Sequence, residues 1–387
     1  MRNFLFVLSA LSLVASGCDT GSSRGHGTGT GTGKDGGPTN PAPGGPDADT
    51  DHDGYTPNTG DCDDSSPLVN PSAVEMPGNG VDDDCNGQVD EPQATCDSAN
   101  SGKNDPTSLV NAFEQCDKRF FLGASLNGPS EPASRNVVDS FGVVMPMGGR
   151  NMAMLSTGKA TTAVSYEPQD GTDYSGGGGV FGTPTTFPNP APDLDSSSAC
   201  TMQQMPQPDV YDYTELVVKL KAPSNATSFS FKFQFFSTEY PEFVCKGFND
   251  QFLVLMESQS EFQKATNIAF DMNKNPITVN SGFFTVCDSK FQPMGTAQGQ
   301  HCTTGLSAIS GTGYDRVPKS SIFNSPADAE AGGATGWLTT TGPVTPNEEV
   351  TLHFIIFDEG DGILDSAVLI DNFVWGAQAV DSPTTIQ

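Results

Sequence analysis

The chain from residue 96 to residue 380 is patterned mainly in short apolar runs separated by turn residues. In the clearest run, Phe229 to Phe235, every second residue is phenylalanine, and this period of two predicts a strand with one aromatic face buried. Runs at such intervals are typical of sandwiches, so we expect a mainly β fold, a jelly-roll-like β-sandwich. Further strands are predicted at residues 216–220, 252–256, 267–270, 283–286, 350–357 and 367–375.

Helical periodicity is confined to one short segment. Leu109, Val110 and Phe113 fall on one face of a helix predicted over Thr107–Gln115, directly after Asp105-Pro106. A Gly-rich insert at 173–198 interrupts the strand pattern and predicts a long surface loop.

Two polar segments precede the sandwich domain, which we place at 96–380. Residues 19–46 are largely Gly, Thr, Ser and Pro, a composition that predicts a flexible tether spanning roughly 30 Å. Residues 47–95, called the acidic module below, contain too few apolar residues to form a core. We therefore expect a metal and a disulfide to hold the acidic module together.

Residues 1–18 have the features of a signal peptide. The apolar run Phe4–Val14 follows Arg2 and is too short to cross a bilayer. Small residues then lead to Cys18, and this pattern resembles a bacterial lipobox, whose cysteine becomes the lipidated first residue. We expect a lipid anchor at Cys18 and a surface-exposed position on the outer membrane. In the alternative, the segment is an ordinary secretory signal and Cys18 is an incidental thiol.

The acidic module repeats one spacing of acidic residues. Between Asp47 and Glu91 there are thirteen carboxylates and no Lys or Arg. Within this stretch, Asp49-x-Asp51-x-Asp53-Gly54 is followed by Asp82-x-Asp84-x-Asn86-Gly87, and such loops wrap around a calcium ion, with the glycine allowing a sharp turn. The predicted calcium ligands are Asp49, Asp51, Asp53, Tyr55 through its carbonyl, Asp61, Asp63, Asp82, Asp84, Asn86, Gln88 and Asp90. Asp64, which also follows the first loop, is expected to help complete its shell.

These loops differ from EF-hands, because position twelve holds Gly60 in the first loop and Gln93 in the second, instead of a glutamate. No helices are predicted to flank them. Weak sites of this kind, with dissociation constants of roughly 10⁻⁴ to 10⁻³ M, suit calcium-rich surroundings outside the cell. The alternative interpretation is a solvated acidic linker without a metal.

The spacing of Asp, Asn, Gly and Cys residues in the acidic module resembles the metal-binding motif of bacterial surface proteins. This family is named after a copper-binding protein. The matching residues include Gly60-Asp-Cys-Asp-Asp64, Glu75, and Asp82 through Gly87 to Glu91. This resemblance raises the possibility of copper, which prefers imidazole and soft ligands. The acidic module offers His52 as its only imidazole, with no arrangement of Met or Trp near it beyond Met76, so we expect calcium and keep copper capture as an alternative.

Several segments of the sandwich domain are similar to the choice-of-anchor L domain. They are Leu155–Gly158, Phe231–Glu242, Phe248–Phe252 and Asp365–Phe373. The resemblance implies a surface or secreted protein held by one of several kinds of anchor, and it implies no established reaction.

Acidic residues also cluster near the ends of the predicted strands of the sandwich. Carboxylates beside buried aromatic residues are unfavourable unless they are paired or bound to metal. We therefore predict a second calcium site formed by Glu239, Asp250, Asp365 and Asp371. In the alternative, these side chains cap turns and satisfy backbone groups.

The cysteine count fits an oxidising compartment. Without Cys18, eight of the nine cysteines remain, an even number suited to four disulfides. Only the first of the pairs below has an argument besides proximity, since it would hold the two acidic loops together, and other pairings stay open. The pairs suggested by proximity are Cys62–Cys85, Cys96–Cys116, Cys200–Cys245 and Cys287–Cys302.

The net charge of −29 excludes nucleic acid as a natural partner, because phosphate binding needs a basic surface. The chain carries no HExxH or P-loop motif, and its G-x-S-x-G match at 21–25 lies in the tether, away from any predicted strand-to-helix turn, so we expect no enzymatic activity. The expected role is adhesion or recognition, with a surface carbohydrate or protein as ligand. The alternatives are an extracellular hydrolase that uses paired acids such as Glu239 and Asp365, and metal capture.

Overall fold

The computed structural model describes most of the chain from residue 44 onward. The chain divides into residues 1–42, of which none is described, and a compact unit of residues 43–387. Cys18, the insert at 173–198 and the pair Cys200–Cys245 lie outside the described residues, and the domain limits stay predictions. The described residues are 44–93, 95–96, 101–127, 134–160, 210–240, 244, 249–271, 275–288, 302–315, 332–359, 365–378 and 384–386.

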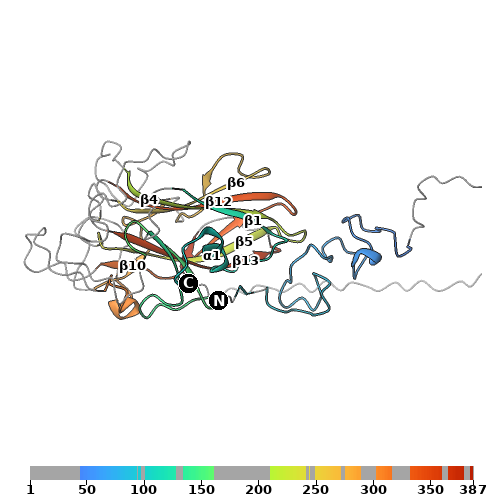
Figure 1. The fold of residues 1–387 in the computed structure, drawn as a ribbon, viewed down its shortest axis with the longest axis horizontal. Coiled ribbons are helices and arrows are strands. Elements are labelled where there is room, and N and C mark those ends of the chain that lie inside the picture. The colour runs from blue at the N-terminus through green and yellow to red at the C-terminus, as the bar shows by residue number, and fades with distance from the viewer. Residues whose placement is uncertain are drawn as a thin grey trace, which may run out of the picture. The chain divides into compact units, whose positions relative to one another are not determined.

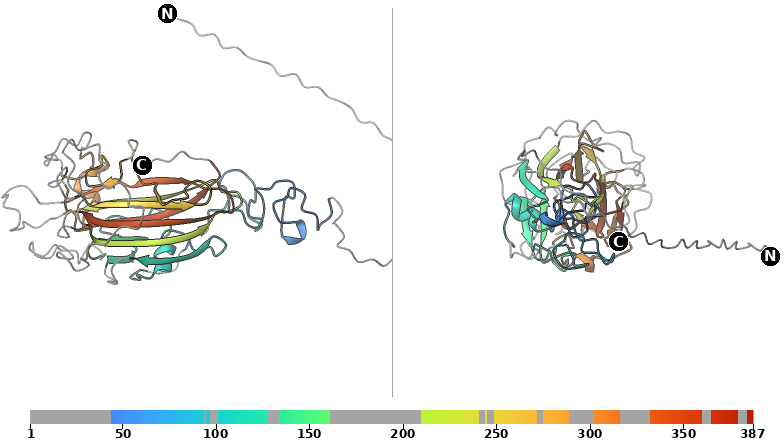
Figure 2. Two further views of the ribbon diagram at one scale, coloured as in Figure 1. Left: turned by 90° about the horizontal axis from the view of Figure 1, so that it is seen from above. Right: turned by 90° about the vertical axis from the view of Figure 1, so that its right-hand side faces the viewer.

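Two antiparallel sheets pack face to face as a sandwich (Figures 1 and 2), which confirms the predicted fold class. In the first sheet the order is β1-β4-β12-β6-β7, with β8 paired to β6. Its strands are β1 (Phe121–Asn127), β4 (Val210–Lys221), β6 (Gln251–Ser258), β7 (Thr266–Asn267), β8 (Ile277–Thr278) and β12 (Glu349–Glu359).

The second sheet has the order β14-β11-β5-β13-β3-β2, and β10 pairs with both β5 and β9. Central β13 lies between β5 and β3, so residues far apart in sequence are neighbours in this sheet. Its strands are β2 (Arg135–Val138), β3 (Met152–Ser156), β5 (Ser228–Ser237), β9 (Phe284–Val286), β10 (Gly333–Thr335), β11 (Leu338–Pro343), β13 (Ser366–Gly376) and β14 (Thr385–Ile386).

The core lies between the sheets and is rich in aromatic rings. Phe231 of β5 contacts Phe354 of β12 with ring centroids 5.2 Å apart, and Phe233 contacts Phe252 of β6 at 4.9 Å. All four side chains are fully buried, and each such ring stabilises the fold by about 1.5–3 kcal/mol. The alternating phenylalanines therefore join the two sheets, as the period of two predicts.

Some strands depart from the simple alternating pattern. In β3, Ala153 and Leu155 face the inter-sheet core, whereas Met152 and Met154 belong to a separate cluster on the other face of the second sheet. Because both faces are covered, every residue of β3 is buried, and polar and apolar residues do not alternate along the strand. The strand predicted at 267–270 is shorter than expected, and Phe270 forms only an isolated bridge.

The predicted helix is present as α1 (Pro106–Asn111) and ends before Gln115. It begins as expected, because the Asp105 carboxylate accepts a hydrogen bond from the Ser108 amide at 3.0 Å. The helix cannot continue through Glu114, whose backbone φ is +77°. Among the described residues, no helix has the length and apolar character needed to cross a membrane.

The described part of the acidic module contains no strand and only a short 3₁₀ turn, η1 (Pro57–Thr59). Its two loops are joined by the Cys62–Cys85 disulfide, as predicted. The predicted pairs Cys96–Cys116 and Cys287–Cys302 are also present.

Specific hydrogen bonds fix the acidic module to one end of the sandwich. The Asn225 side chain, beyond β4, donates to the Val74 carbonyl at 2.8 Å and accepts from the Val74 amide at 3.1 Å. In the same way, the Gln93 side chain donates to the carbonyl of Trp375 in β13 at 3.0 Å and accepts from the Trp375 amide at 3.1 Å. These contacts use backbone atoms as a neighbouring strand would, so the acidic module is held in a defined place.

Candidate metal centre

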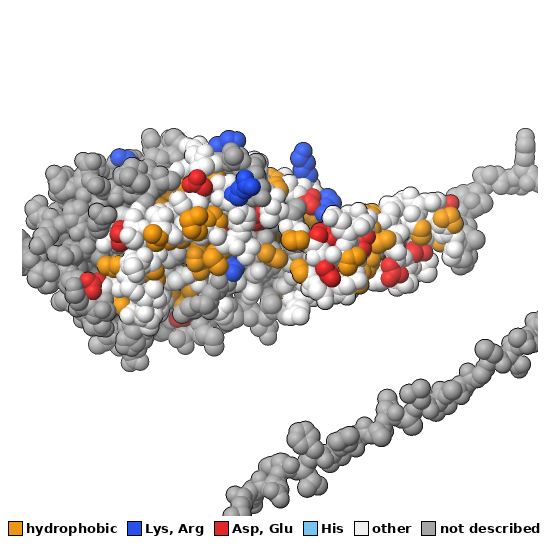
Figure 3. All heavy atoms as spheres, turned by 90° about the horizontal axis from the view of Figure 1, so that it is seen from below, with side chains coloured by type: hydrophobic (Ala, Val, Ile, Leu, Met, Phe, Trp, Pro, Cys, Tyr) orange, Lys and Arg blue, Asp and Glu red, His pale blue; other side chains and the backbone are white. Residues whose placement is uncertain are grey.

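The acidic module gathers its carboxylates into two sets. In the first acid group, oxygens of Asp49, Asp51 and Asp53 lie within 4.8 Å of one another, and Asp51 also meets Asp61 and Asp64 within the same distance. Asp51 is therefore shared by two triads. Acidic side chains colour the surface at the right of Figure 3, where Figure 1 places the acidic module.

Backbone amides orient the carboxylates of the first loop. Asp49 accepts hydrogen bonds from the amides of His52 and Gly54, at 2.7 and 3.1 Å. The first oxygens of Asp51 and Asp53 each accept from the amide two residues later. Gly54 has a backbone φ of +98°, which allows the tight turn that brings these amides inward.

The second loop has a hydrogen-bond pattern similar to that of the first, although its first aspartate accepts from the amide four residues later instead of three. Asp82 accepts from the amides of Asn86 and Gly87, at 3.0 and 2.9 Å, and Gly87 has a φ of +92°. Asp84 and Asn86 each accept from the amide two residues later, at 3.2 and 2.9 Å. The repeated spacing in the sequence therefore corresponds to a repeated local structure.

Several carboxylate oxygens of the first acid group have no hydrogen-bond partner. The second oxygens of Asp51, Asp53 and Asp61 are buried and accept no hydrogen bond. Burial raises the pKa of Asp51 and of Asp61, and repulsion from Asp53 raises both pKa values further. A bound divalent cation would supply the missing positive charge and give these oxygens a partner.

The second acid group consists of Glu75, Asp84 and Glu91, which also bring oxygens within 4.8 Å. Glu75 is only 3% exposed and accepts from the amides of Asp84 and Asp90, at 3.1 and 3.0 Å. Its pKa is raised by burial and by the Glu91 charge. One oxygen of Glu91 accepts from the Asn86 side chain, and the other is buried without a partner.

Some predicted ligands do not join these groups. Asp90 accepts from the amides of Gly78 and Gly80, at 2.7 and 3.1 Å, and belongs to neither acid group, so its role as a ligand stays a prediction. Asp63 instead accepts from the Ser65 hydroxyl at 2.6 Å. Asp82 lies outside the second acid group as well, and its oxygens accept from loop amides as those of Asp49 do. Asp64 joins Asp51 and Asp61, as expected for the acids that follow the first loop, whereas Glu75 and Glu91 take part without having been predicted as ligands.

Three of the predicted ligands are not acids. Tyr55 follows the first loop, and its amide binds Asp53; a role for its carbonyl stays a prediction. The same holds for Asn86 and Gln88, which share a hydrogen bond at 2.9 Å. Glu75 could have been suspected from sequence, since it is a lone acid among Ala73, Val74 and Met76.

A cavity of about 340 Å³ lies beside the second acid group. The acidic module contributes Glu75, Asp84 and Glu91 to its lining, and the sandwich contributes Arg119 and Trp375. Arg119 is 3.4 Å from Asp84 in an ion pair. The second acid group therefore lies where the acidic module meets the sandwich domain.

In the sandwich, three of the four predicted acids gather at one end of the strands. Asp250 lies just before β6, Glu239 just after β5 and Asp365 just before β13, and the Asp250 amide donates to Glu239 at 3.4 Å. Asp371 is six residues further along from Asp365 and accepts from the amides of Met147 and Gly148. The predicted grouping of Asp371 with the other three is wrong, because the strand carries it roughly 20 Å away.

Two family models match the sequence. The choice-of-anchor L domain matches residues 136–373. The model described as "Putative metal-binding motif" matches residues 61–91, which include the whole second acid group but not the first loop. No curated protein and no solved structure matches the chain. With more than half of its residues matched by the first model, the chain belongs to the choice-of-anchor L domain family and carries a metal-binding motif ahead of that domain.

Proposed function

We propose that this is a calcium-binding protein of the bacterial cell surface, in which calcium fixes the acidic module against a recognition domain. Both matching families fit a cell-surface protein. The lipid anchor at Cys18 and its outer-membrane position belong to the same proposal. The tether would then place the acidic module and the sandwich at a distance from the membrane.

The observation that carries the proposal is the convergence of unpaired oxygens in the first acid group. Asp51, Asp53 and Asp61 each direct one oxygen to a backbone amide and keep one buried oxygen without a partner. A solvated acidic linker would turn such oxygens toward water. Backbone amides that hold the carboxylates in place reduce the entropy lost when an ion binds.

The donor atoms favour calcium over copper. All members of both acid groups are carboxylates, and hard oxygen ligands suit calcium. The imidazole of His52 is exposed, and its Nδ1 lies 3.0 Å from the Asp49 carbonyl oxygen. It does not belong to any acid group among the described residues. Copper capture therefore remains the less favoured function.

Calcium at the second acid group would also strengthen the joint with the sandwich. Asp84 belongs to that group and contacts Arg119, while Gln93 binds the backbone of Trp375. The Glu75 carboxylate accepts from the amides of Asp84 and Asp90, and its carbonyl accepts from the Gln93 side chain at 3.3 Å. An ion here would fix the side chains that link the two domains, so the acidic module would act as a stiff spacer.

Recognition rather than hydrolysis is proposed for the sandwich domain. The pair suggested for a glycosidase, Glu239 and Asp365, is 3% and 0% exposed, whereas a polysaccharide needs open access to both acids. A glycan array read for both binding and bond cleavage separates the two roles. Retention of a glycan without cleavage supports recognition, and release of reducing ends supports the hydrolase.

The calcium proposal is tested by thermal unfolding of the full chain after treatment with EGTA. We expect the melting temperature to fall on chelation and to recover with calcium but not with copper. The variant Asp53→Asn should reduce the recovery, while Glu257→Gln, an exposed acid on β6, should leave it unchanged. An unchanged melting temperature together with stoichiometric copper binding would overturn the assignment.

A further inference from the structure

The inward faces of the strands change from apolar to polar at the end of the sandwich away from the acidic module. In β12, Phe354 and Ile356 point into the inter-sheet core, and two residues further the same face carries Asp358. In β6, Phe252 points into the core and Asp250 precedes it by two residues. Both acids thus occupy positions that would continue the hydrophobic core.

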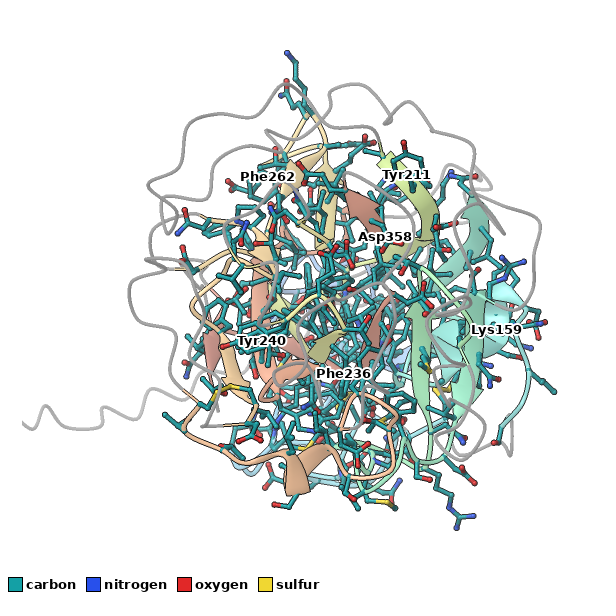
Figure 4. The ribbon with its side chains drawn as sticks, turned by 90° about the vertical axis from the view of Figure 1, so that its left-hand side faces the viewer. Lys159, Tyr211, Phe236, Tyr240, Phe262 and Asp358 are labelled. Atoms are coloured by element: carbon teal, nitrogen blue, oxygen red, sulfur yellow. A yellow bond between two sulfur atoms is a disulfide. The ribbon has the colours of Figure 1, made fainter. Side chains whose placement is uncertain are left out.

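The opposite sheet supplies further polar groups at the same level. Ser366, at the start of β13, donates from its hydroxyl to Asp250 at 2.6 Å, and Asp365 immediately precedes it. Figure 4 looks onto this end of the sandwich and labels Asp358 near its middle. The end layer, defined as Asp212, Asp250, Asp358 and Asp365, therefore draws on strands of both sheets.

The carboxylates of the end layer are sealed from water. Asp250 and Asp365 are 0% exposed, and Asp358 is 1% exposed. Neither oxygen of Asp358, nor Oδ1 of Asp250, accepts a hydrogen bond. Thr157 lies close by, but its hydroxyl donates to the Ser366 carbonyl at 3.3 Å. Among the described residues, no lysine or arginine forms an ion pair with Asp250 or Asp358.

The backbone is distorted where Asp212 enters this layer. The register between β12 and β4 shifts between Ile356 and Asp358, as at a β-bulge. Asp212 has a φ of +50°, in the left-handed region that is unfavourable for a residue with a side chain. The bulge adds a fourth acid to the layer, which is the opposite of what an unliganded core would favour.

Electrostatics supports the same interpretation. Burial raises the pKa of Asp358 well above its usual range, and repulsion from Asp250, Asp365 and Asp212 raises it further. Burial also raises the pKa of Asp250 to about 7. A proton shared between Asp250 and Asp358 would remove one negative charge, whereas a divalent cation would neutralise two and give the unpaired oxygens ligand contacts.

We propose that Asp212, Asp250, Asp358 and Asp365 bind a divalent cation of the calcium class inside the sandwich. The acids of this layer form no triad as tight as those of the acidic module, so the side chains would close around the ion. The ion would tie the starts of β4, β6 and β13 to the end of β12. This site is independent of the acidic module, which lies at the other end of the strands.

The test counts calcium ions bound to the full chain by equilibrium dialysis and elemental analysis, after removal of metals with EGTA. Asp358→Asn should bind one ion fewer than the wild type. Asp371→Asn, a matched buried aspartate whose partners are backbone amides, should bind the same number. Equal numbers of ions in the wild type and a folded Asp358→Asn variant would overturn the proposal.

A second chain, with Asp51→Asn and Glu75→Gln combined, isolates the end layer from the acidic module. We expect it to retain one calcium ion, and to lose this ion when Asp358→Asn or Asp250→Asn is added. If Asp358→Asn does not fold, the module variant decides: one ion retained supports the site, and none overturns it. If the acidic module fails to bind calcium, the wild type should still bind one ion.

Discussion

Acids of the same type have different partners in this protein, and the partner decides what each one does. Asp51 and Asp371 are both held by backbone amides. Asp51 keeps a free oxygen that faces other acids. Asp371 uses one oxygen for Met147 and Gly148 and the other for Asn372. The first arrangement suits a cation, and the second fastens a loop to β13.

The pKa of Asp371 leads to a prediction about acid. Burial raises this pKa to about 6, although the amides of Met147 and Gly148 lower it. Because the folded-state pKa is above the unfolded value, the stabilisation from Asp371 is complete at low pH and is lost as the pH rises through 6. Between pH 7.5 and 4.5, the wild type should gain about 2 kcal/mol over Asp371→Asn.

Urea unfolding of both proteins at the two pH values measures this difference. The comparison removes the contributions of the other acids, which both proteins share. A difference that stays constant with pH, or grows as the pH rises, would contradict the raised pKa.

At the scale of secondary structure, polar residues join neighbouring strands of the first sheet. Glu215 of β4 is 2% exposed and lies 2.6 Å from Nδ1 of His353 on β12. Asn127 of β1 donates to the other oxygen of Glu215 at 2.8 Å. Burial alone would raise the pKa of Glu215, but the hydrogen bonds from His353 and Asn127 hold it below its usual value. Three strands are therefore linked by one carboxylate.

The variant His353→Ala should destabilise the protein by about 1–3 kcal/mol, because it removes a partner from a buried carboxylate. Thr351→Ala, two residues earlier on the same face of β12, serves as the control and should change the free energy of unfolding by less than about 0.5 kcal/mol. Urea unfolding at pH 7 gives both values. Equal effects of the two substitutions would show that the hydrogen bond to Glu215 contributes nothing.

Strand prediction succeeded where burial follows the alternation of the chain. Phe229 to Phe235 was identified because one face of β5 meets the aromatic core. β6 and β13 are buried on both faces and were still predicted, because their apolar runs are continuous. β3 has only five residues, and β11 is mostly threonine and is defined by its pairing with β5 and β14, so neither was predicted. Local pattern therefore predicts alternating or continuous apolar runs better than short or polar strands.

At the scale of the whole molecule, the acidic module depends on the sandwich for its position. Asn225 satisfies both backbone groups of Val74, and the Ser224 hydroxyl donates to Asn70 at 2.8 Å. Val74 packs with the main core cluster. Neither the disulfide Cys62–Cys85 nor calcium at the first loop replaces these contacts.

Asn225→Ala should therefore loosen the acidic module without unfolding the sandwich. The substitution leaves the buried amide and carbonyl of Val74 without partners, which weakens the contact by about 1–3 kcal/mol. Hydrogen exchange should show faster exchange of the Val74 amide and unchanged exchange in β5. Asn136→Ala, on β2, is the control and should leave Val74 protected; equal exchange in both variants would contradict this account.

The sequence by itself determined the two acidic loops, because their turns depend on residues two to five positions apart and on Gly54 and Gly87. It also determined the sandwich class, through alternation within single strands. Tertiary structure alone decided how each group of acids is completed. Glu75 and Glu91 reach Asp84 through the fold of the acidic module.

Tertiary structure decides the composition of the end layer even more than that of the acid groups in the acidic module. Asp212, Asp250 and Asp358 come together only through the pairing of β4, β12 and β6, and a bulge in that pairing places Asp212. The prediction grouped Asp371 with Glu239, Asp250 and Asp365, and it left out Asp212 and Asp358. Asp371 and Asp365 are near in sequence, but an extended strand separates them. Spacing along the chain determines local turns, whereas strand register determines which distant carboxylates share one place.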